Sequence, residues 1–357
     1  MKKLKINLHG YVNNNLGDDL FFEYLANRYP SYTFRLFAPS IYSDTFNSTE
    51  NIELIYPTIM KRVLNKLYKM LFKKNLNFYT DKVDISLLVG GSLFMENKDW
   101  RIVHQEFNNK FTASKKKYLL GANFGPYTSQ EFYDAYKKEF IDFEDICFRE
   151  KYSKNLFKDL KNVRIAPDLL FGYENDMLNI NQDKKVFISV IKPSYREDLN
   201  GIDTKYYQGI VTLIEKFILR GYEITLVSFC EAEGDEEAVN EIYSLLEKKT
   251  SVDRLYYKGF NREEILKNLA ESEIVVATRF HAMILGWVSN KKVLPLIYSN
   301  KTLNVIKDVG FSGEYIDIKK DDDYSISLND IDILKNVNSI ALKSQNHFEI
   351  LDTVLKY

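Results

Sequence analysis

The stretch EIVVATRFHAMILGWVSNKKVLPLIYSNK, residues 273–301, sets the structural pattern of the whole chain. It begins with EIVVA, a short apolar run rich in β-branched residues, which predicts a buried strand. An apolar helical segment, AMILGWV, follows, and then a second apolar strand, VLPLIY. Strand, helix and strand in this order predict an open α/β fold with a parallel sheet.

Charged side chains follow both of these strands. Arg279 and His281 come directly after EIVVA, and Lys301 follows VLPLIY. Because ligands of open α/β sheets bind outside the carboxyl ends of the strands, the three side chains predict a site for an anionic small molecule. For His281 taken alone, the alternative is a satisfied core residue at the start of an apolar helix.

The same alternation of strands and helices runs through the rest of the chain. Five strands are predicted in the first half, at residues 5–8, 33–37, 83–89, 117–122 and 145–149. The polar, aperiodic segment GYENDMLNINQDKK (172–185) interrupts the pattern, and five more strands follow, VFISV, EITLVSF, RLYYK, EIVVAT and KVLPLIY. We expect two α/β domains, residues 1–175 and 176–345, and a C-terminal helix at 346–357 that packs back on the first domain.

Composition narrows the class of protein. The 357 residues include 45% apolar residues, enough for two cores, and 49 basic against 50 acidic side chains leave a formal charge of -1, which excludes a global field that recruits nucleic acid. The two cysteines, Cys147 and Cys230, have no metal-type spacing and suit a reducing compartment. Neither a signal peptide nor an apolar run of membrane-spanning length is recognisable, so we expect a cytoplasmic protein, at most peripheral to a membrane.

Two loops after predicted strands contain glycines and polar side chains. In NNNLGDDL (13–20), Gly17 permits a tight turn, while Asp18 or Asp19 either caps the next helix or, in the case of Asp18, points into the crevice as a base for a substrate hydroxyl. In VGGSLF (89–94), the pair Gly90 and Gly91 lets a ligand approach the backbone closely. This loop is neither GxGxxG nor a P-loop, so it does not support nucleotide binding.

Three later segments have two interpretations each. GANFGPY (121–127) either forms a strand-to-helix turn or contacts a ligand directly. Arg149, after the strand DICF, either binds a carboxylate or phosphate with its guanidinium fork or pairs with a nearby acid. Asp168, in APDLLF, either orients a side chain of the crevice or caps the connection that follows.

Metal and covalent chemistry have no candidates in the sequence. The remaining histidines, His9, His104 and His347, lack the spacing of a zinc site. No GxSxG motif occurs, and no thiol stands beside a histidine. We therefore expect neither a metal nor a cofactor.

Taken in order, the segments NNNLGDDL, GGSLF, GANFGP, FREKYS, APDLLF, TRFHAMILGWVSN and YSNK resemble the motifs of the polysaccharide pyruvyl transferase family. The resemblance spans most of the chain and rests on the ordered set. It implies two Rossmann-like domains facing a central cleft, similar to the GT-B glycosyltransferases. It also implies transfer of the enolpyruvyl group of phosphoenolpyruvate to two hydroxyls of one sugar, which forms a cyclic pyruvate ketal and releases phosphate.

The resemblance assigns roles to residues. Phosphoenolpyruvate binding falls to Arg149, Arg279 and Lys301, and catalysis to Asp18, Arg279 and His281. Binding of the sugar acceptor falls to Asn15, Gly17, Asp18, Gly90, Gly91, Ser92, Asn123 and Asp168. The chemistry agrees, because a carboxylate and a phosphate held without a metal need several fixed cations, and a histidine would then transfer protons.

Two departures from the family pattern concern the acceptor side. Members commonly have a third glycine where this chain has Ser92, and a glycine where it has Asn13. The identity of the sugar is therefore less certain than that of the donor. Two other functions stay open, a GT-B glycosyltransferase that uses a nucleotide sugar and a non-catalytic scaffold in polysaccharide assembly. Consumption of phosphoenolpyruvate with phosphate release, against nucleotide release, separates the two enzymes.

The segment IMKRVLNKLYKMLFKK (59–74) predicts where the acceptor is found. It contains six basic residues and no acidic one, with apolar residues on one helical face. Such a helix either lies on an anionic inner-membrane surface, in which case the acceptor is a lipid-linked glycan, or packs its apolar face inward as an ordinary helix.

Overall fold

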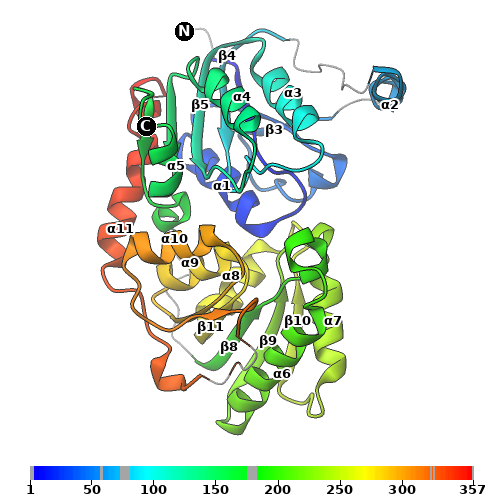
Figure 1. The fold of residues 1–357 in the computed structure, drawn as a ribbon, viewed down its shortest axis with the longest axis vertical. Helices are drawn as coiled ribbons and strands as arrows, with labels where there is room; N and C mark the ends of the chain where they lie inside the picture. The colour runs from blue at the N-terminus through cyan, green and yellow to red at the C-terminus, as the bar shows by residue number, and fades with distance from the viewer. Residues whose placement is uncertain are drawn as a thin grey trace. The chain divides into compact units, whose positions relative to one another are not determined.

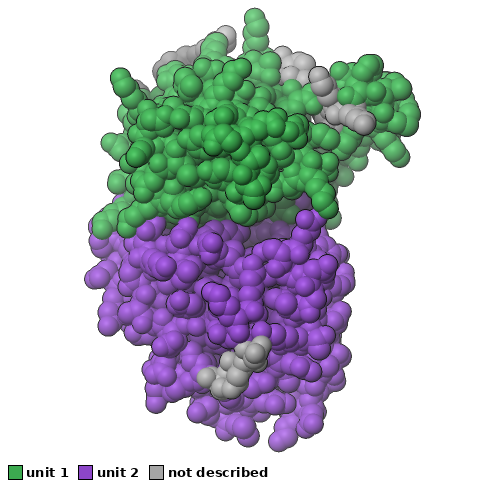
Figure 2. Space-filling view, in the orientation of Figure 1, with its two compact units in different colours: residues 1–12, 20–169, 343–357 green, residues 13–19, 170–342 purple. Residues whose placement is uncertain are grey.

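The structure is a computed structural model that describes residues 4–56, 59–72, 81–174, 183–321, 324 and 326–355. The chain divides into two compact units, coloured separately in Figure 2. Unit 1 comprises residues 1–12, 20–169 and 343–357, and unit 2 comprises residues 13–19 and 170–342. The predicted boundary between residues 175 and 176 lies outside the described residues.

Unit 1 is built on a seven-stranded parallel sheet in the order β3-β2-β1-β4-β5-β6-β7 (Figure 1). Its strands are β1 (Ile6–His9), β2 (Phe34–Phe37), β3 (Ile52–Ile55), β4 (Val83–Val89), β5 (Ser114–Ala122), β6 (Asp145–Phe148) and β7 (Val163–Ile165). Its helices are α1 (Leu16–Arg28), whose first turn groups with unit 2, α2 (Ile59–Phe72), α3 (Trp100–Phe111), α4 (Gln130–Phe140) and α5 (Lys151–Leu156).

Unit 2 repeats this plan with a six-stranded parallel sheet in the order β10-β9-β8-β11-β12-β13. Its strands are β8 (Asp183–Ser189), β9 (Glu223–Ser228), β10 (Val252–Tyr256), β11 (Ser272–Ala277), β12 (Lys292–Ile297) and β13 (Ile316–Asp317). Its helices are α6 (Asp203–Leu219), α7 (Asp235–Leu245), α8 (Arg262–Glu271), α9 (Phe280–Val288), α10 (Asn300–Val309) and most of α11 (Val337–Ser344).

Both sheets have the strand order of doubly wound folds. The order reverses between β1 and β4 in unit 1, and between β8 and β11 in unit 2. At such a switch point the loops that follow the two neighbouring strands diverge, which leaves room for a ligand at their carboxyl ends. The loops after these four strands are therefore the candidate positions for a ligand site.

The two cores differ in chemistry. In unit 1, α3 and α4 cover one face of the sheet (Figure 1). Their aromatic rings pack with rings from the segments after β4, β5 and α5, and the cluster includes Phe94, Phe107, Phe124, Phe132, Tyr136, Phe140 and Phe157. In unit 2, α6 and α7 pack mainly aliphatic side chains against β8, β9 and β11. Helix α9 is buried along nearly its whole length, as its sequence FHAMILGWV requires.

All ten predicted strands are confirmed, with ends that differ by a few residues. The short strands β3, β7 and β13 were not predicted. The C-terminal segment, predicted as a helix at 346–357, instead forms two 3-10 turns, Gln345–Phe348 and Leu351–Thr353, after α11.

This C-terminal segment belongs to unit 1 through specific polar contacts. Asp352 accepts hydrogen bonds from the guanidinium of Arg28 at 2.6 Å and from the hydroxyl of Tyr29 at 2.6 Å. Arg164 donates to the backbone carbonyl of His347 at 2.7 Å. The segment therefore completes the polar surroundings of α1 and β7.

One of the two arrangements predicted for helix α2, the one with its apolar face packed inward, is wrong. Its apolar side chains are exposed, so it does not pack them inward as an ordinary helix does. Among the described residues, no helix has the length and apolar character that crossing a membrane requires.

Candidate functional site

Arg279 is the centre of a charged cluster in unit 2. It lies between β11 and α9, and its side chain is 7% exposed. Its guanidinium forms a two-point ion pair with Asp235 and donates to Oε2 of Glu233 at 2.7 Å. Burial alone would lower the pKa of Arg279, but Asp235 and Glu233 outweigh it and raise the pKa well above its usual value.

Asp235 is fixed from the other side by backbone. Its Oδ2 accepts hydrogen bonds from the backbone N–H groups of Phe229 and Cys230, both at 3.0 Å, at the carboxyl end of β9. Burial raises the pKa of Asp235 to about 6 against the opposing effect of Arg279, so the side chain is still a carboxylate at neutral pH. Asp235 therefore holds the Arg279 guanidinium in one orientation.

Glu233 joins two arginines. Its Oε2 accepts from Arg279 and from Arg196, the latter also at 2.7 Å, and Arg196 lies in the loop region that follows β8. Burial alone would raise the pKa of Glu233, but Arg279 and Arg196 outweigh it and lower the pKa to about 2. The carboxylate thus occupies the place where two guanidinium groups converge, as the carboxylate or phosphate of a ligand would.

Tyr298 and Lys301 extend the cluster at the end of β12. The Arg196 guanidinium lies over the Tyr298 ring, 5.1 Å from its centroid. Burial alone would raise the pKa of Tyr298, but the positive charges of Arg196, Lys301 and Arg279 outweigh it and lower the pKa below its usual value. The positive charges of three side chains therefore all favour the ionised form of this phenol.

His281 packs against the backbone of Gly17. Both residues belong to unit 2, and a Cβ placed on Gly17 would lie 1.7 Å from Nδ1 of His281. Only glycine allows this approach, so the imidazole and the first turn of α1 are fitted to each other. The close approach of His281 therefore explains why the NLGD motif has a glycine at position 17, which could not be inferred from the sequence.

The segment 13–19 is held to unit 2 by further bonds. Asn15 forms an isolated bridge with Cys230, and the amide of Leu16 donates to the carbonyl of Phe229 at 3.1 Å. Asp19 is fully buried and accepts a hydrogen bond from the hydroxyl of Tyr257 at 2.7 Å.

The predicted cap of α1 was wrong. Asn15, not Asp18 or Asp19, caps the helix, because its Oδ1 accepts from the amide of Gly17 at 3.1 Å. Asp18 lies in the first turn and is 9% exposed. Its predicted role as a base stays a prediction.

Gly17→Ala is expected to lower the free energy of unfolding by about 1–3 kcal/mol, because the new methyl group collides with the imidazole of His281. Urea unfolding of the single variants and of Gly17→Ala/His281→Ala measures the effect. The double variant should recover most of the loss, since removal of the imidazole makes room for the methyl group. A loss that His281→Ala does not relieve would contradict the steric explanation.

A second buried network lies in unit 1 around Arg149. Its guanidinium donates to Asp168 at 3.0 Å and to Asn123 Oδ1 at 2.7 Å, with Ser92 at 3.5 Å. The side chains of Arg149 and Asp168 are 2% and 0% exposed. The guanidinium also lies against Gly91, where a Cβ would be 2.5 Å from one of its nitrogens. Arg149, which itself follows β6, thus ties together the loops at the carboxyl ends of β4, β5 and β7.

Arg149→Lys is expected to cost about 1–3 kcal/mol of unfolding free energy, because one ammonium group cannot replace a fork that serves both Asp168 and Asn123. Urea unfolding measures the change. Arg101→Lys is the matched control in unit 1, since the Arg101–Glu131 pair is 63% exposed at both partners and should change stability little. Equal effects of the two substitutions would contradict the importance of the buried network.

The structure divides the predicted site residues into two groups, one in each unit. These two groups differ from the predicted donor-side and acceptor-side groups. Unit 2 contains the predicted donor-side residues Arg279, His281 and Lys301 together with Asn15, Gly17 and Asp18, which were predicted on the acceptor side of the first domain. Unit 1 contains Gly90, Gly91, Ser92, Asn123 and Asp168 together with Arg149, which was predicted to bind phosphoenolpyruvate. The ion pair with Asp168 is the alternative that the sequence left open for Arg149. Its role in binding phosphoenolpyruvate stays a prediction.

Four residues of the unit 2 cluster were not predicted, namely Arg196, Glu233, Asp235 and Tyr298. Three of them follow β8 or β9 and one directly follows β12, so the strand-end argument that found Arg279 would have found them had it been applied to every strand. The acidic partners in CEAEGDEE look like ordinary solvated loop residues in the sequence.

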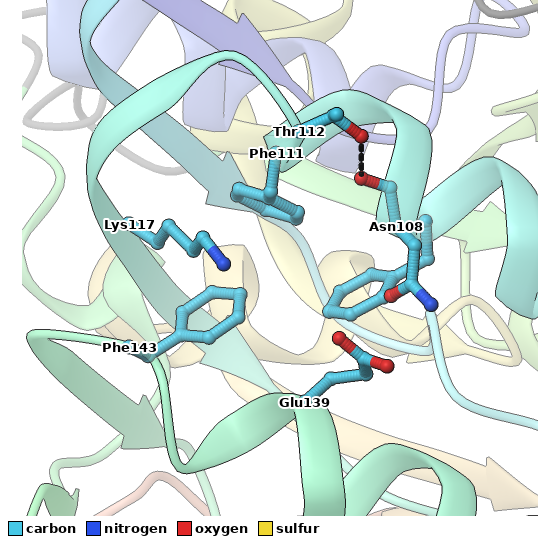
Figure 3. A pocket seen from close by; sticks show the side chains of 7 residues that line it. Asn108, Phe111, Thr112, Lys117, Glu139 and Phe143 are labelled. Carbon is cyan, nitrogen blue, oxygen red and sulfur yellow. Dashed lines mark hydrogen bonds between the residues drawn. The ribbon is translucent and has the colours of Figure 1, made fainter.

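A small pocket opens elsewhere in unit 1 (Figure 3). It has a volume of about 160 Å³ and lies at the amino end of β5, the edge of the sheet opposite the Arg149 network. Its lining is formed by Phe107, Asn108, Phe111, Thr112, Lys117, Glu139 and Phe143, which include none of the predicted site residues. Within the described parts of the chain, no group of three or more histidine, cysteine, aspartate or glutamate side chains could hold a metal ion.

Comparisons with known proteins agree with this fold. The UDP-GlcNAc 2-epimerase from Neisseria meningitidis bound to UDP-GlcNAc is 11% identical, with a TM-score of 0.52 and coverage of 99% of both chains. A glycosyltransferase from Rickettsia africae ESF-5 is 12% identical, with a TM-score of 0.50 and coverage of 99% of this chain and 90% of that chain. At these identities the likeness concerns the fold alone, and the predicted α/β class with two Rossmann-like domains of GT-B type is confirmed.

Sequence comparison identifies the family. The amylovoran biosynthesis protein AmsJ of Erwinia amylovora is 21% identical over 369 residues, covering 93% of this chain and 86% of AmsJ. A sequence model described as polysaccharide pyruvyl transferase matches residues 15–300. This match includes the loops around Arg149 and Arg279 and spans far more than half of the chain, which therefore belongs to the polysaccharide pyruvyl transferase family.

Proposed function

We propose that this pyruvyltransferase moves the enolpyruvyl group of phosphoenolpyruvate onto two hydroxyls of one sugar in a polysaccharide precursor, with release of phosphate. The observation that carries the proposal is the convergence of the Arg196 and Arg279 guanidinium groups on Glu233 in unit 2, with Arg196 also over the Tyr298 ring. The positive charge of Lys301 helps to lower the pKa of both Glu233 and Tyr298. Phosphoenolpyruvate has a carboxylate and a phosphate close together, and several fixed cations suit such a ligand without a metal.

Glu233 occupies the position in this cation cluster that a ligand anion would take. It now satisfies Arg196 and Arg279, and a ligand anion would compete with it for both guanidinium groups. Asp235 keeps Arg279 in place during such an exchange because its bonds to Arg279 and to the backbone of β9 do not involve Glu233. In the proposal, Arg196 and Lys301 bind the anion, while Arg279 binds it and stabilises developing charge.

The reaction then needs proton transfer, which the proposal assigns to His281 and Asp18. A proton is added to the methylene carbon of phosphoenolpyruvate, and the first sugar hydroxyl attacks the cationic carbon next to the carboxylate and loses its proton. The bond between this carbon and the phosphate oxygen then breaks, and phosphate leaves. The second hydroxyl attacks the resulting oxocarbenium carbon and gives its proton to the departing phosphate. The product is a cyclic ketal of pyruvate. Asp18, which follows Gly17 in the first turn of α1, is the residue proposed to accept a hydroxyl proton.

We also propose a role in sugar binding for one group of loops in unit 1. The loops that carry Gly91, Ser92 and Asn123 lie at the carboxyl ends of the neighbouring strands β4 and β5, where both contact the Arg149 guanidinium that is paired with Asp168. Parallel sheets bind ligands at this edge, which supports a role for these loops in binding the sugar. We include in the proposal that the sugar is part of a lipid-linked glycan made at the cytoplasmic face of a membrane.

The test is phosphate release from phosphoenolpyruvate by the purified protein with a panel of lipid-linked and synthetic glycans, together with mass spectrometry of the sugar product. We expect phosphate in equal amount to a product heavier than the acceptor by pyruvic acid minus one water. Arg196→Ala should weaken protection of the fold by phosphoenolpyruvate in thermal melts, while the exposed Arg254→Ala should not. Release of nucleotide from a nucleotide sugar instead, or no protection by phosphoenolpyruvate at all, would overturn the proposal.

A further inference from the structure

The apolar side chains of α2 are exposed along one arc of the helix. At about 100° per residue they span roughly 140° of the helix circumference. Their exposed fractions range from 49% for Leu64 and Leu67 to 80% for Ile59. The residues of this apolar arc are Ile59, Met60, Val63, Leu64, Leu67, Met70 and Leu71. Isolated exposed apolar residues are common on proteins, but seven on one helical arc mark an interaction surface.

Helix α2 turns a polar side toward the protein and its apolar arc outward, which is the reverse of an ordinary surface helix. Among its described side chains, only Asn65 and Tyr68 are half-buried, and all others are exposed. Neither of these two residues belongs to the apolar arc. In a helix that packs on its own protein, the apolar arc would be the least exposed part. Figure 1 shows α2 outside the layers formed by α3, α4 and the sheet of unit 1.

The charges beside the apolar arc have a single sign. Residues 59–74 include six basic residues and no acidic one. Of these, Arg62, Lys66 and Lys69 are described in the structure and are exposed. An apolar arc flanked only by positive charge is complementary to a surface that is apolar below and anionic above, which is the chemistry of a bilayer with acidic headgroups.

We propose that α2 is a membrane-docking helix that lies in the interfacial plane of an anionic bilayer. The apolar arc enters the boundary between headgroups and acyl chains, and the basic residues contact the headgroup phosphates. A second copy of the chain is a poorer occupant, because two all-basic helices would repel each other. Nucleic acid would use the positive charges but leave the apolar arc in water.

The test is co-flotation of the full-length protein with vesicles of phosphatidylcholine alone or of equal parts phosphatidylcholine and phosphatidylglycerol. We expect flotation only with the anionic vesicles, and its loss on raising the salt concentration. Lys66→Glu/Lys69→Glu should lower the bound fraction at limiting lipid by at least about 10-fold. Leu67→Ser/Met70→Ser should lower it by a similar factor, since it removes two members of the apolar arc.

The matched control is Lys138→Glu/Lys161→Glu, which makes the same charge change at two exposed lysines of unit 1 outside α2 and should float like the wild type. All α2 variants should keep the thermal midpoint of the wild type because their side chains are exposed. Wild-type protein that does not float, or variants of α2 that float like the control, would overturn the proposal. Sedimentation that shows a dimer abolished by Leu67→Ser/Met70→Ser, without lipid binding, would assign the helix to self-association instead. The experiment needs no substrate, so its failure leaves pyruvyl transfer untouched.

Discussion

Arg279→Ala is expected to lower the free energy of unfolding by about 3–5 kcal/mol, in addition to abolishing turnover. The substitution removes the guanidinium that now pairs with the fully buried Asp235 and with the half-buried Glu233. Of the two acids, Glu233 keeps another arginine partner, Arg196. Asp235 is fully buried, so it would have to keep an uncompensated charge or bind a proton. Equilibrium urea unfolding measures the loss, and phosphate release from phosphoenolpyruvate measures the activity.

The control for this experiment is Arg254→Ala, which removes an exposed arginine of the same unit and should change stability by about 0.5 kcal/mol or less. Arg279→Ala/Asp235→Asn should recover part of the lost stability, because it removes the unpaired charge. If Arg279→Ala unfolds at the same urea concentration as Arg254→Ala, the ion pairs seen around Arg279 do not contribute to the folded state.

His281→Ala is expected to lower the turnover of phosphoenolpyruvate by ~10²–10⁴-fold while the unfolding free energy changes by about 1 kcal/mol or less. The imidazole is only half-buried, so little packing is lost, whereas a group positioned for proton transfer cannot be replaced by solvent. His281→Gln keeps a polar side chain but no titratable group, and it should be as inactive as His281→Ala. Single-turnover phosphate release distinguishes the chemical step from product release.

His104→Gln is the matched control, because His104 is a half-buried histidine of α3 in unit 1. It should leave turnover unchanged. Near-normal activity of His281→Gln would remove the proposed proton transfer, and the contact with Gly17 would then be a packing contact alone. A decrease in stability as large as the decrease in transition-state binding would lead to the same conclusion.

Strands inside the sheets could be predicted because burial on both faces leaves a continuous apolar run. The run VDISLLV corresponds to β4 residue for residue. The strands β3, β7 and β13 are short and lie at the edges of their sheets. Their sequences IELI, VRI and ID therefore lack the signal that predicts a buried strand.

The candidate site could be predicted only in part. The strand-end rule predicted Arg279, His281 and Lys301, because ligands of α/β folds generally bind at the carboxyl ends of the strands. Which acid pairs with which arginine depends on loops far apart in the sequence, such as Glu233 with both Arg196 and Arg279. Periodicity and spacing do not contain that information, so the grouping of Arg149 with Asn123 and Asp168 also required the structure.

The division of the chain has a consequence for its synthesis. Unit 1 is made of residues 1–12, 20–169 and 343–357, so all of unit 2 leaves the ribosome before unit 1 is complete. Arg28 can bind Asp352, and Arg164 can bind the carbonyl of His347, only after the whole of unit 2 has been translated. The usual order, in which an N-terminal domain folds first, cannot apply here without a late step. A frameshift after residue 342 would thus damage unit 1, whose first residues are translated first, and leave the sequence of unit 2 unchanged.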